Sequence, residues 1–298
     1  MRNAFTVDVE DYFHVQSFAK TVHPRDWDQH ESRVVANTRR ILRLLENHQV
    51  HGTFFILGWV ADRFPELVQE IHQAGHEIGC HSFWHRLIYN MTPEDFREDL
   101  LQGCKAIEEI TDQRVTAFRA PSFSITEQSL WALDILIEEG FRYDSSIFPV
   151  YHDTYGIPDA DRFPHRIEGS RGALWEFPPS VHRLGKLNVP VAGGGYFRLY
   201  PAWLSSRWLS RINRIENRPF VFYIHPWELD PDQPRLPGSL RSRFRHYQNL
   251  RTTESKLATL LERFHFASLS DALSDHSRDG ARAATHALHG YLDTAVPR

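Results

Sequence analysis

The sequence has only two cysteines, Cys80 and Cys104, in 298 residues. This number excludes a disulfide framework, and both cysteines lie in apolar or helical contexts, so we expect buried free thiols. A Gly-rich phosphate loop is also missing, because the triple glycine at 193–195 lacks both the GxGxxG spacing and a strand-to-helix context. No serine or cysteine nucleophile elbow occurs. These absences disfavour phosphate-loop nucleotide binding and catalysis by an activated serine.

Long apolar runs and a strong excess of one charge are missing as well. The N-terminus reaches Asp8 without the apolar core of a signal peptide, and no run approaches the length of a transmembrane helix. We therefore expect a cytoplasmic protein, with peripheral attachment at the inner face of the membrane left open. The formal net charge of −4 does not suggest a nucleic-acid partner.

The apolar pattern predicts strands that alternate with helices. From 147 to 200 the helical rhythm lapses, and the tail at 276–298 is poorly patterned. Repeated alternation implies an α/β fold with parallel strands and helical crossovers, either a doubly wound sheet or a barrel. We expect one domain over 1–275, in which 147–275 forms a distinct C-terminal part. Strands are predicted at 3–9, 53–57, 76–80, 115–118, 141–145, 220–224 and 266–269, and helices at 32–47, 62–74, 92–110, 126–139, 201–215 and 254–264.

Chemically reactive side chains stand at the ends of these predicted strands. They are Asp8, His81, Arg119, Asp144 and His225. In parallel α/β folds, catalytic groups gather at the C-terminal ends of the strands. We therefore expect these five residues to converge.

A metal site is indicated by His81 and His85, which share one face if the segment between them turns helically. Two histidines and one carboxylate form a three-ligand site with an open position, the pattern of catalytic zinc. Asp8 together with Glu10 or Asp11 supplies one carboxylate for the metal and a second one to act as a base.

Other predicted residues complete a hydrolytic set. A bound metal would lower the pKa of a water molecule and polarise a carbonyl group. Arg119 can hold a carboxylate base ionised and oriented, and His225 can protonate a leaving amine. Hydrolysis of an amide or ester therefore needs no covalent intermediate.

Five motifs, given in chain order at the end of this paragraph, resemble those of the polysaccharide deacetylases. These are carbohydrate esterases with a NodB-type catalytic domain. The sequence is also similar to the subgroup associated with exosortase-type exopolysaccharide clusters, through DVEDYF, RAPSFS, GGGYFR and HPWE at 225–228. The five motifs are TVDVED at 6–11, HSFWH at 81–85, RAP at 119–121, YDSS at 143–146 and YIH at 223–225.

The resemblance implies a distorted (β/α) barrel of about seven strands. It implies a divalent metal, usually zinc, held by one acid and by residues matching His81 and His85. It implies Asp8 as general base, Arg119 as its partner and His225 as general acid. The substrate would be an N-acetylated amino sugar in a glycan, from which acetate is released, and the protein would associate peripherally with an exopolysaccharide synthesis machinery.

The departures from the family pattern leave several residues open. The common motif has two adjacent aspartates, whereas here the metal-binding acid is Glu10 or Asp11. Glu176 is our first choice for the acid that orients His225, and Asp144 is the second. A metal-dependent amidohydrolase for small cyclic amides and a non-catalytic glycan-binding protein remain as alternatives. The candidate substrate-binding residues are Pro121, Ser122, Phe123, Asp144, Tyr196 and Trp227.

Overall fold

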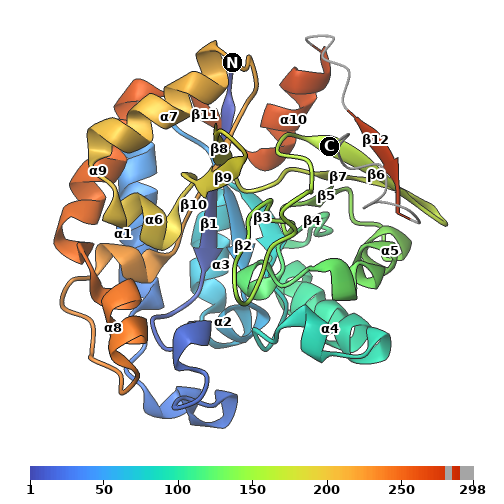
Figure 1. Ribbon diagram of the computed structural model, residues 1–298. Coiled ribbons are helices and arrows are strands. Elements are labelled where there is room, and N and C mark those ends of the chain that lie inside the picture. The colour runs from blue at the N-terminus through green and yellow to red at the C-terminus, as the bar shows by residue number, and fades with distance from the viewer. Residues whose placement is uncertain (279–283, 289–298) are drawn as a thin grey trace.

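The computed structural model describes residues 1–278 and 284–288 and shows a mostly parallel sheet surrounded by helices (Figure 1). The parallel strands follow the order β10–β1–β2–β3–β4–β5–β7, and the antiparallel β6 and then β12 extend the sheet beyond β7. β11 pairs with the first residues of β1. The predicted α/β fold is confirmed. The strands are β1 (Asn3–Val9), β2 (Thr53–Ile56), β3 (Glu77–Cys80), β4 (Ala117–Phe118), β5 (Tyr143–Asp144), β6 (His165–Gly169), β7 (Gly172–Glu176), β10 (Val221–Ile224), β11 (Phe266–Ala267) and β12 (Thr285–Ala287).

The edge at β10 is covered by the chain that follows β7. Among the described residues the strand order runs from β10 to β12 without closing on itself. The backbone N–H of Val221 donates to Ser180 Oγ, and that of Tyr223 donates to the carbonyl of Ala192. The segment after β7 therefore lies along β10, where it takes up hydrogen-bonding groups that an open edge would expose.

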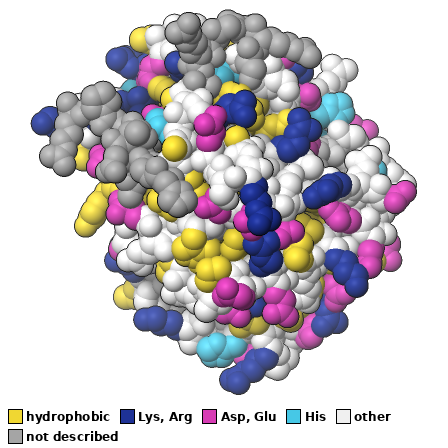
Figure 2. All heavy atoms as spheres, turned by 90° about the vertical axis from the view of Figure 1, so that its right-hand side faces the viewer, with side chains coloured by type: hydrophobic (Ala, Val, Ile, Leu, Met, Phe, Trp, Pro, Cys, Tyr) yellow, Lys and Arg dark blue, Asp and Glu magenta, His cyan; other side chains and the backbone are white. Residues whose placement is uncertain are grey.

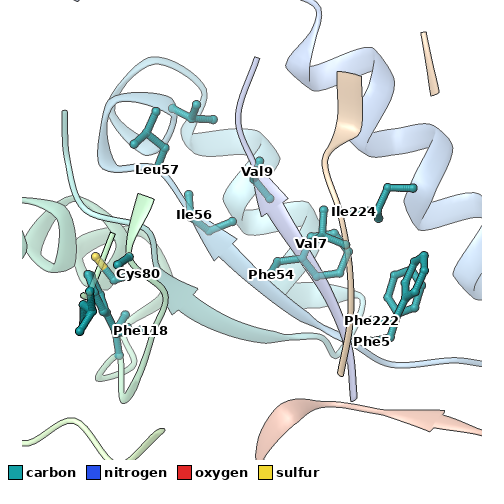
Figure 3. Packing of buried hydrophobic residues seen from close by; sticks show 14 of the residues in the cluster. Phe5, Val7, Val9, Phe54, Ile56, Leu57, Cys80, Phe118, Phe222 and Ile224 are labelled. Carbon is teal, nitrogen blue, oxygen red and sulfur yellow. The ribbon is translucent and has the colours of Figure 1, made fainter. Parts of the chain in front are cut away.

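Strand alternation divides the side chains of β1 between two environments. Phe5, Val7 and Val9 belong to the main apolar cluster, in which they lie near Phe54 and Ile56 of β2 (Figure 3). The residues between them, including Thr6 and Asp8, point to the opposite face. Because β1 pairs in register with β2 and β10, this second face carries the polar residues at the strand ends.

The helices pack mainly on the apolar face, but the helix Leu269–Arg278 packs on the opposite face, against Ala4 and Phe55. The predicted helix at 62–74 is in fact two helices, because Pro65 lacks an N–H and restricts Phe64, whose φ and ψ are −136° and 58°. The helices are α1 (Val34–Asn47), α2 (Gly58–Arg63), α3 (Pro65–Gln73), α4 (Pro93–Thr111), α5 (Trp131–Glu138), α6 (Gly194–Leu199), α7 (Ala202–Arg214), α8 (Leu240–Tyr247), α9 (Leu250–Arg263) and α10 (Leu269–Arg278).

The region at 147–200 holds strands that the sequence analysis did not predict. β6 and β7 form an antiparallel pair on the main sheet, and β8 (Val181–Leu184) and β9 (Leu187–Pro190) form a separate hairpin. In the predicted tail, β12 pairs with β6, and α10 extends to residue 278; the rest of that tail lies outside the described residues. No helix in the described ranges has both the length and the apolar character to cross a bilayer.

Candidate metal centre and active site

Three predicted metal ligands meet beyond the ends of β1 and β3. One ligand atom each from Glu10, His81 and His85 lies within 4.8 Å of the others, and all three side chains are buried. Glu10 follows β1 directly, and His81 follows β3. Convergence at this end of the sheet agrees with the expectation drawn from parallel strands.

The segment from His81 to His85 is a loop, so the helical geometry expected for this pair is wrong. Ser82 and His85 have φ values of 63° and 54°, in the left-handed region. Asp99 on α4 accepts hydrogen bonds from the N–H groups of Phe83 (2.8 Å) and Trp84 (3.3 Å), which a helix would direct elsewhere. The loop still brings the two imidazoles together, with ring centroids 5.4 Å apart.

The ring of His81 is oriented and uncharged, so that one of its nitrogens can bind a cation. His81 Nδ1 lies 2.7 Å from the carbonyl oxygen of Arg119, so a hydrogen on Nδ1 leaves Nε2 free as a ligand. Burial is the largest influence on this ring and lowers the pKa of His81 to about 4. His81 is therefore neutral at neutral pH, the form that binds a metal.

Glu10 supplies the negative charge of the site. Burial acts to raise its pKa, but the neighbouring His85 and His225 outweigh burial and hold the pKa of Glu10 below its usual value. Its Oε1 accepts a hydrogen bond from Trp227 Nε1 (3.2 Å). Its Oε2 is buried and lacks a well-oriented hydrogen bond among the described residues, although His85 Nε2 lies 2.7 Å away. Two imidazoles and one carboxylate with a spare lone pair fit a divalent transition metal such as zinc.

Asp8 and Arg119 form a buried ion pair beside these ligands. Arg119 Nη1 lies 2.7 Å from Asp8 Oδ1 and also donates to Thr6 Oγ1. Ser145 fixes the other side of the guanidinium, through its carbonyl (3.1 Å) and its Oγ (2.8 Å). The ring of Phe55 lies 4.4 Å from the guanidinium carbon. Arg119 thus has one orientation, and it fixes that of Asp8.

His225 faces both carboxylates from the end of β10. Its Nε2 lies 3.7 Å from Asp8 Oδ2 and 3.6 Å from Glu10 Oε1. Its Nδ1 lies 2.8 Å from Glu228 Oε1. Burial acts to lower the pKa of His225, but Glu10, Glu228 and Asp8 together raise it to about 9. His225 is therefore protonated at neutral pH.

The acid that contacts His225 is thus Glu228, not the predicted Glu176 or Asp144. Glu228 is fully buried, and Arg198 Nε donates to its Oε2 at 2.6 Å. Arg198 also donates to the carbonyls of His246 and Gln248, so the pair ties the end of α8 to this site.

Glu176 and Asp144 lie buried beside each other, away from His225. Burial is the largest influence on both and raises both pKa values, so the two carboxyl groups share a proton. Asp144 accepts from Ser146 Oγ, and Glu176 accepts from the N–H of Ile147. Both residues shape the loop that carries Ser145. Neither is exposed to a substrate.

Asp11, the alternative metal ligand, points away from the histidines. Its Oδ2 accepts from Ser32 Oγ (2.7 Å) and from the N–H groups of Arg33 (2.8 Å) and Val34 (3.0 Å). Ser32 and Arg33 directly precede α1 and Val34 is its first residue, and the N-cap residue, Arg33, makes no side-chain cap of its own. Asp11 therefore caps α1 from a distance.

Aromatic rings border the site on two sides. Trp227 stacks between His225 and His246, with centroid distances of 5.2 and 4.2 Å, so it supports the site rather than projecting from it. Phe123 packs against Tyr223 at 5.0 Å. The other predicted substrate-binding residues lie nearby on this side: Pro121 and Ser122 with Phe123 in a 3₁₀ turn (Pro121–Phe123), and Tyr196 in α6.

One cavity adjoins the metal ligand His85, and a second one lies next to it. A cavity of about 240 Å³ lies beside His85 and is lined by His14, Trp27 and Trp84. A wider depression of about 860 Å³ continues on the other side of Trp84. His85 therefore borders open space on the side of Trp27 and Trp84.

Sequence reasoning missed Glu228, Arg198 and Asp99. Glu228 follows His225 by three residues, a spacing that allows a side-chain contact in a turn, and Arg198 is the charged residue of the GGGYFR motif. Asp99 interrupts the apolar stripe of α4 between Phe96 and Gly103. A charged residue at such a position signals a buried polar partner.

Two family models match different parts of this chain. The family model described as polysaccharide deacetylase matches residues 27–137. The chain carries a polysaccharide deacetylase domain. A second family model, a domain of unknown function (DUF3473), matches residues 145–274.

Relatives of the deacetylase domain include a peptidoglycan deacetylase of Helicobacter pylori, which is 31% identical over 108 residues. That alignment covers 36% of this chain and 36% of the relative, so the chain spans about a third of the length of such curated relatives.

Solved structures share the fold over nearly the whole chain. A Mycobacterium smegmatis protein assigned to the polysaccharide deacetylases has a TM-score of 0.62 at 20% identity, covering 95% of this chain and 92% of its own. A Pseudomonas aeruginosa protein with the same assignment has a TM-score of 0.61 at 16% identity, covering 93% and 90%. The deacetylase domain and the C-terminal part therefore belong to one architecture.

Proposed function

We propose that this chain is a metal-dependent hydrolase that removes N-acetyl groups from amino sugars of a glycan. The observation that carries the proposal is the placement of three groups at one end of the sheet. These are the Glu10, His81 and His85 ligand set, the Asp8–Arg119 pair and the His225–Glu228 pair. They supply a metal site, a base and an acid, which amide hydrolysis by water requires.

Asp8 is placed to accept the proton of the attacking water. Arg119 occupies its Oδ1, and Oδ2 remains turned toward the open side of the site where His225 lies. Glu10, His81 and His85 would hold a divalent metal, which would lower the pKa of that water and polarise the acetyl carbonyl. The rigid hold on Arg119 through Ser145 and Thr6 keeps the Asp8 carboxylate in one orientation.

His225 is placed to protonate the leaving nitrogen. Its raised pKa keeps a proton on the ring at neutral pH, and Glu228 binds Nδ1 so that Nε2 faces the site. When the C–N bond breaks, the proton moves from Nε2 to the amine of the sugar, and acetate carries the oxygen of the water. The acid and the base thus act on different atoms of one amide.

The substrate we propose is an N-acetylated exopolysaccharide or its precursor. Relatives that match the deacetylase domain include enzymes described as peptidoglycan deacetylases, which act on N-acetylated glycans. The exopolysaccharide assignment rests on the resemblance carried by DVEDYF, RAPSFS, GGGYFR and HPWE, of which the last two lie in the 145–274 region. It also implies a place beside the synthesis machinery for that polymer.

The test combines metal analysis with acetate release. Purified wild type and His81→Ala are assayed for zinc, and for acetate released from N-acetylglucosamine oligomers, the N-acetylated exopolysaccharide and peptidoglycan. We expect about one zinc per wild-type chain. We also expect His81→Ala to lose both zinc and acetate release. His265→Ala, which changes an exposed histidine, serves as the matched control.

Each outcome decides one part of the proposal. Zinc without acetate from any glycan would overturn the substrate class and favour a small cyclic amide. Release from peptidoglycan alone would overturn the exopolysaccharide assignment. No metal in either protein, even after zinc is added back, would overturn the metal-dependent mechanism.

A further inference from the structure

Helix α8 (Leu240–Tyr247) turns apolar side chains outward. Leu240 is 84% exposed and Phe244 is 63% exposed, and the spacing of four residues puts both on one face. The buried residue of the helix is His246, which packs against Phe18 and Trp227 on the opposite side. A surface helix of a globular protein normally shows the reverse pattern, with polar residues outward.

Leu240 and Phe244 together form an apolar ridge on α8. Arginines flank this apolar ridge on both sides. With about 100° between successive residues, Arg241 and Arg243 each lie about 80° from the line through Leu240 and Phe244. Both are exposed, as is Arg245. Long cationic side chains beside an outward apolar ridge are the arrangement of a helix that lies at a lipid–water interface.

The surrounding chain is strongly basic in a protein of net negative charge. Between Gln233 and Thr253 the sequence has five arginines and no lysine or acidic residue. One carboxylate from outside the segment reaches it, since Arg241 lies 3.4 Å from Asp153. The side of the molecule shown in Figure 2 is turned away from α8, and there acidic side chains lie among the basic ones over its described part.

The contact between Arg241 and Asp153 places the loop that contains Asp153 next to α8. That loop carries Tyr151, which is 91% exposed. Three large apolar or aromatic side chains and three arginines therefore share one region of the surface. A hydrated acidic polymer would pair with the arginines but would leave the aliphatic Leu240 in water, whereas a bilayer takes up both kinds of group.

We propose that α8 and Tyr151 dock this protein on the surface of an anionic lipid bilayer. Leu240, Phe244 and Tyr151 enter the headgroup region, and the arginines bind lipid phosphates. The inference stands independently of the proposed deacetylase activity.

Docking there would set the orientation of the catalytic site. His246 of α8 stacks on Trp227, which stacks on His225, and Arg198 joins Glu228 to the carbonyl of His246. Two stacked rings, those of His246 and Trp227, therefore separate the docking helix from His225. A glycan attached to a lipid in the same membrane would be held close to it.

The test is co-sedimentation of the full chain with large unilamellar vesicles. One set contains phosphatidylcholine with a minor share of phosphatidylglycerol, and the other contains phosphatidylcholine alone. We expect wild type to bind the first set and to dissociate as ionic strength rises. Leu240→Ser/Phe244→Ser should bind at least tenfold more weakly. Replacing Arg241, Arg243 and Arg245 by Gln should cost about fivefold for each arginine.

Leu101→Ser, which changes a half-exposed leucine on α4, is the matched control and should bind as wild type does. Circular dichroism establishes that each variant remains folded. Equal binding of wild type and the Leu240/Phe244 variant would overturn the proposal. Retention on heparin without vesicle binding would replace the bilayer by an acidic polysaccharide. A dimer that the double substitution dissociates, without vesicle binding, would assign the ridge to a second copy of the chain.

Discussion

At the scale of single residues, the contact between His225 and Glu228 supports His225 as the proposed catalytic acid. Replacing Glu228 by Gln keeps an acceptor for Nδ1 but removes a buried negative charge. We expect kcat for acetate release to fall about 100-fold, because the protonated imidazole loses stabilisation and the amide can turn its NH₂ toward the ring. The measurement is steady-state acetate release together with zinc content.

Zinc content should stay near that of wild type, because Glu228 does not contact the ligand atoms. Glu254→Gln, which changes an exposed acid paired with Arg40, is the control for the substitution itself. An unchanged kcat in Glu228→Gln would show that another group orients or replaces His225.

The meeting of Asp8, His81, Arg119 and His225 could be predicted from the sequence, and the role of the neighbouring acids could not. Parallel strands bring their C-terminal ends together, so residues at those ends converge whatever the loops do. The partner of His225 depends on how the chain turns after β10. The turn Pro226–Leu229 folds Glu228 back onto His225, whereas Glu176 is held by Asp144 and Ile147.

At the scale of elements, Asp11 connects the metal site to helix α1. Asp11→Ala removes the acceptor of Ser32, Arg33 and Val34, and we expect a loss of about 1–2 kcal/mol in the free energy of unfolding. Zinc should still bind with unchanged stoichiometry. Chemical denaturation and metal analysis measure the two effects.

Glu10→Ala is the matched change one residue earlier in the chain. It should abolish zinc binding, because Glu10 is the carboxylate that lies with the two histidines. If Asp11→Ala loses zinc and Glu10→Ala retains it, the assignment of these two acids is reversed.

The triple glycine offers another test of an element, the start of α6. Gly193 has φ of 153°, and a Cβ there would lie 1.9 Å from the carbonyl oxygen of Tyr223. Gly193→Ala should therefore cost about 3 kcal/mol or more, measured by denaturation. Gly195→Ala is the control, since its nearest neighbour would be 3.8 Å away. Equal stability of the two variants would contradict the close approach of this loop to β10.

Helices and strands with a long, regular apolar periodicity could be predicted from the sequence. Short strands without such a periodicity could not. The strand at 3–9 and the helix at 92–110 have apolar periodicity and clear end signals, and they appear as β1 and α4. The strands β6 to β9 have four or five residues each, and only β6 and β7 alternate between buried and more exposed positions. Their pairing depends on contacts between distant segments, which local sequence does not record.

At the scale of the whole molecule, metal binding should stabilise the fold. The ligands come from two separate strand ends, so the unfolded chain does not hold them together. At a zinc concentration about 100 times the dissociation constant, we expect a gain of about 2.7 kcal/mol, or an increase of about 5 °C in the melting temperature. Differential scanning calorimetry with and without a chelator measures it.

His85→Ala should lose this increase, and His265→Ala, at an exposed site, should retain it. An equal increase in all three proteins would place the stabilising zinc elsewhere. The two variants therefore separate the candidate centre from binding by surface histidines.

The order of the site residues along the chain has a consequence for synthesis. Glu10, His81 and His85 all emerge from the ribosome before His225, which follows His85 by 140 residues. A nascent chain that ends before β10 already contains the entire ligand set and the Asp8–Arg119 pair, but it lacks the proton donor and the strand that covers one side of β1. Metal capture can thus precede catalytic competence, and the proposed hydrolysis begins only when β10 has joined the sheet beside β1.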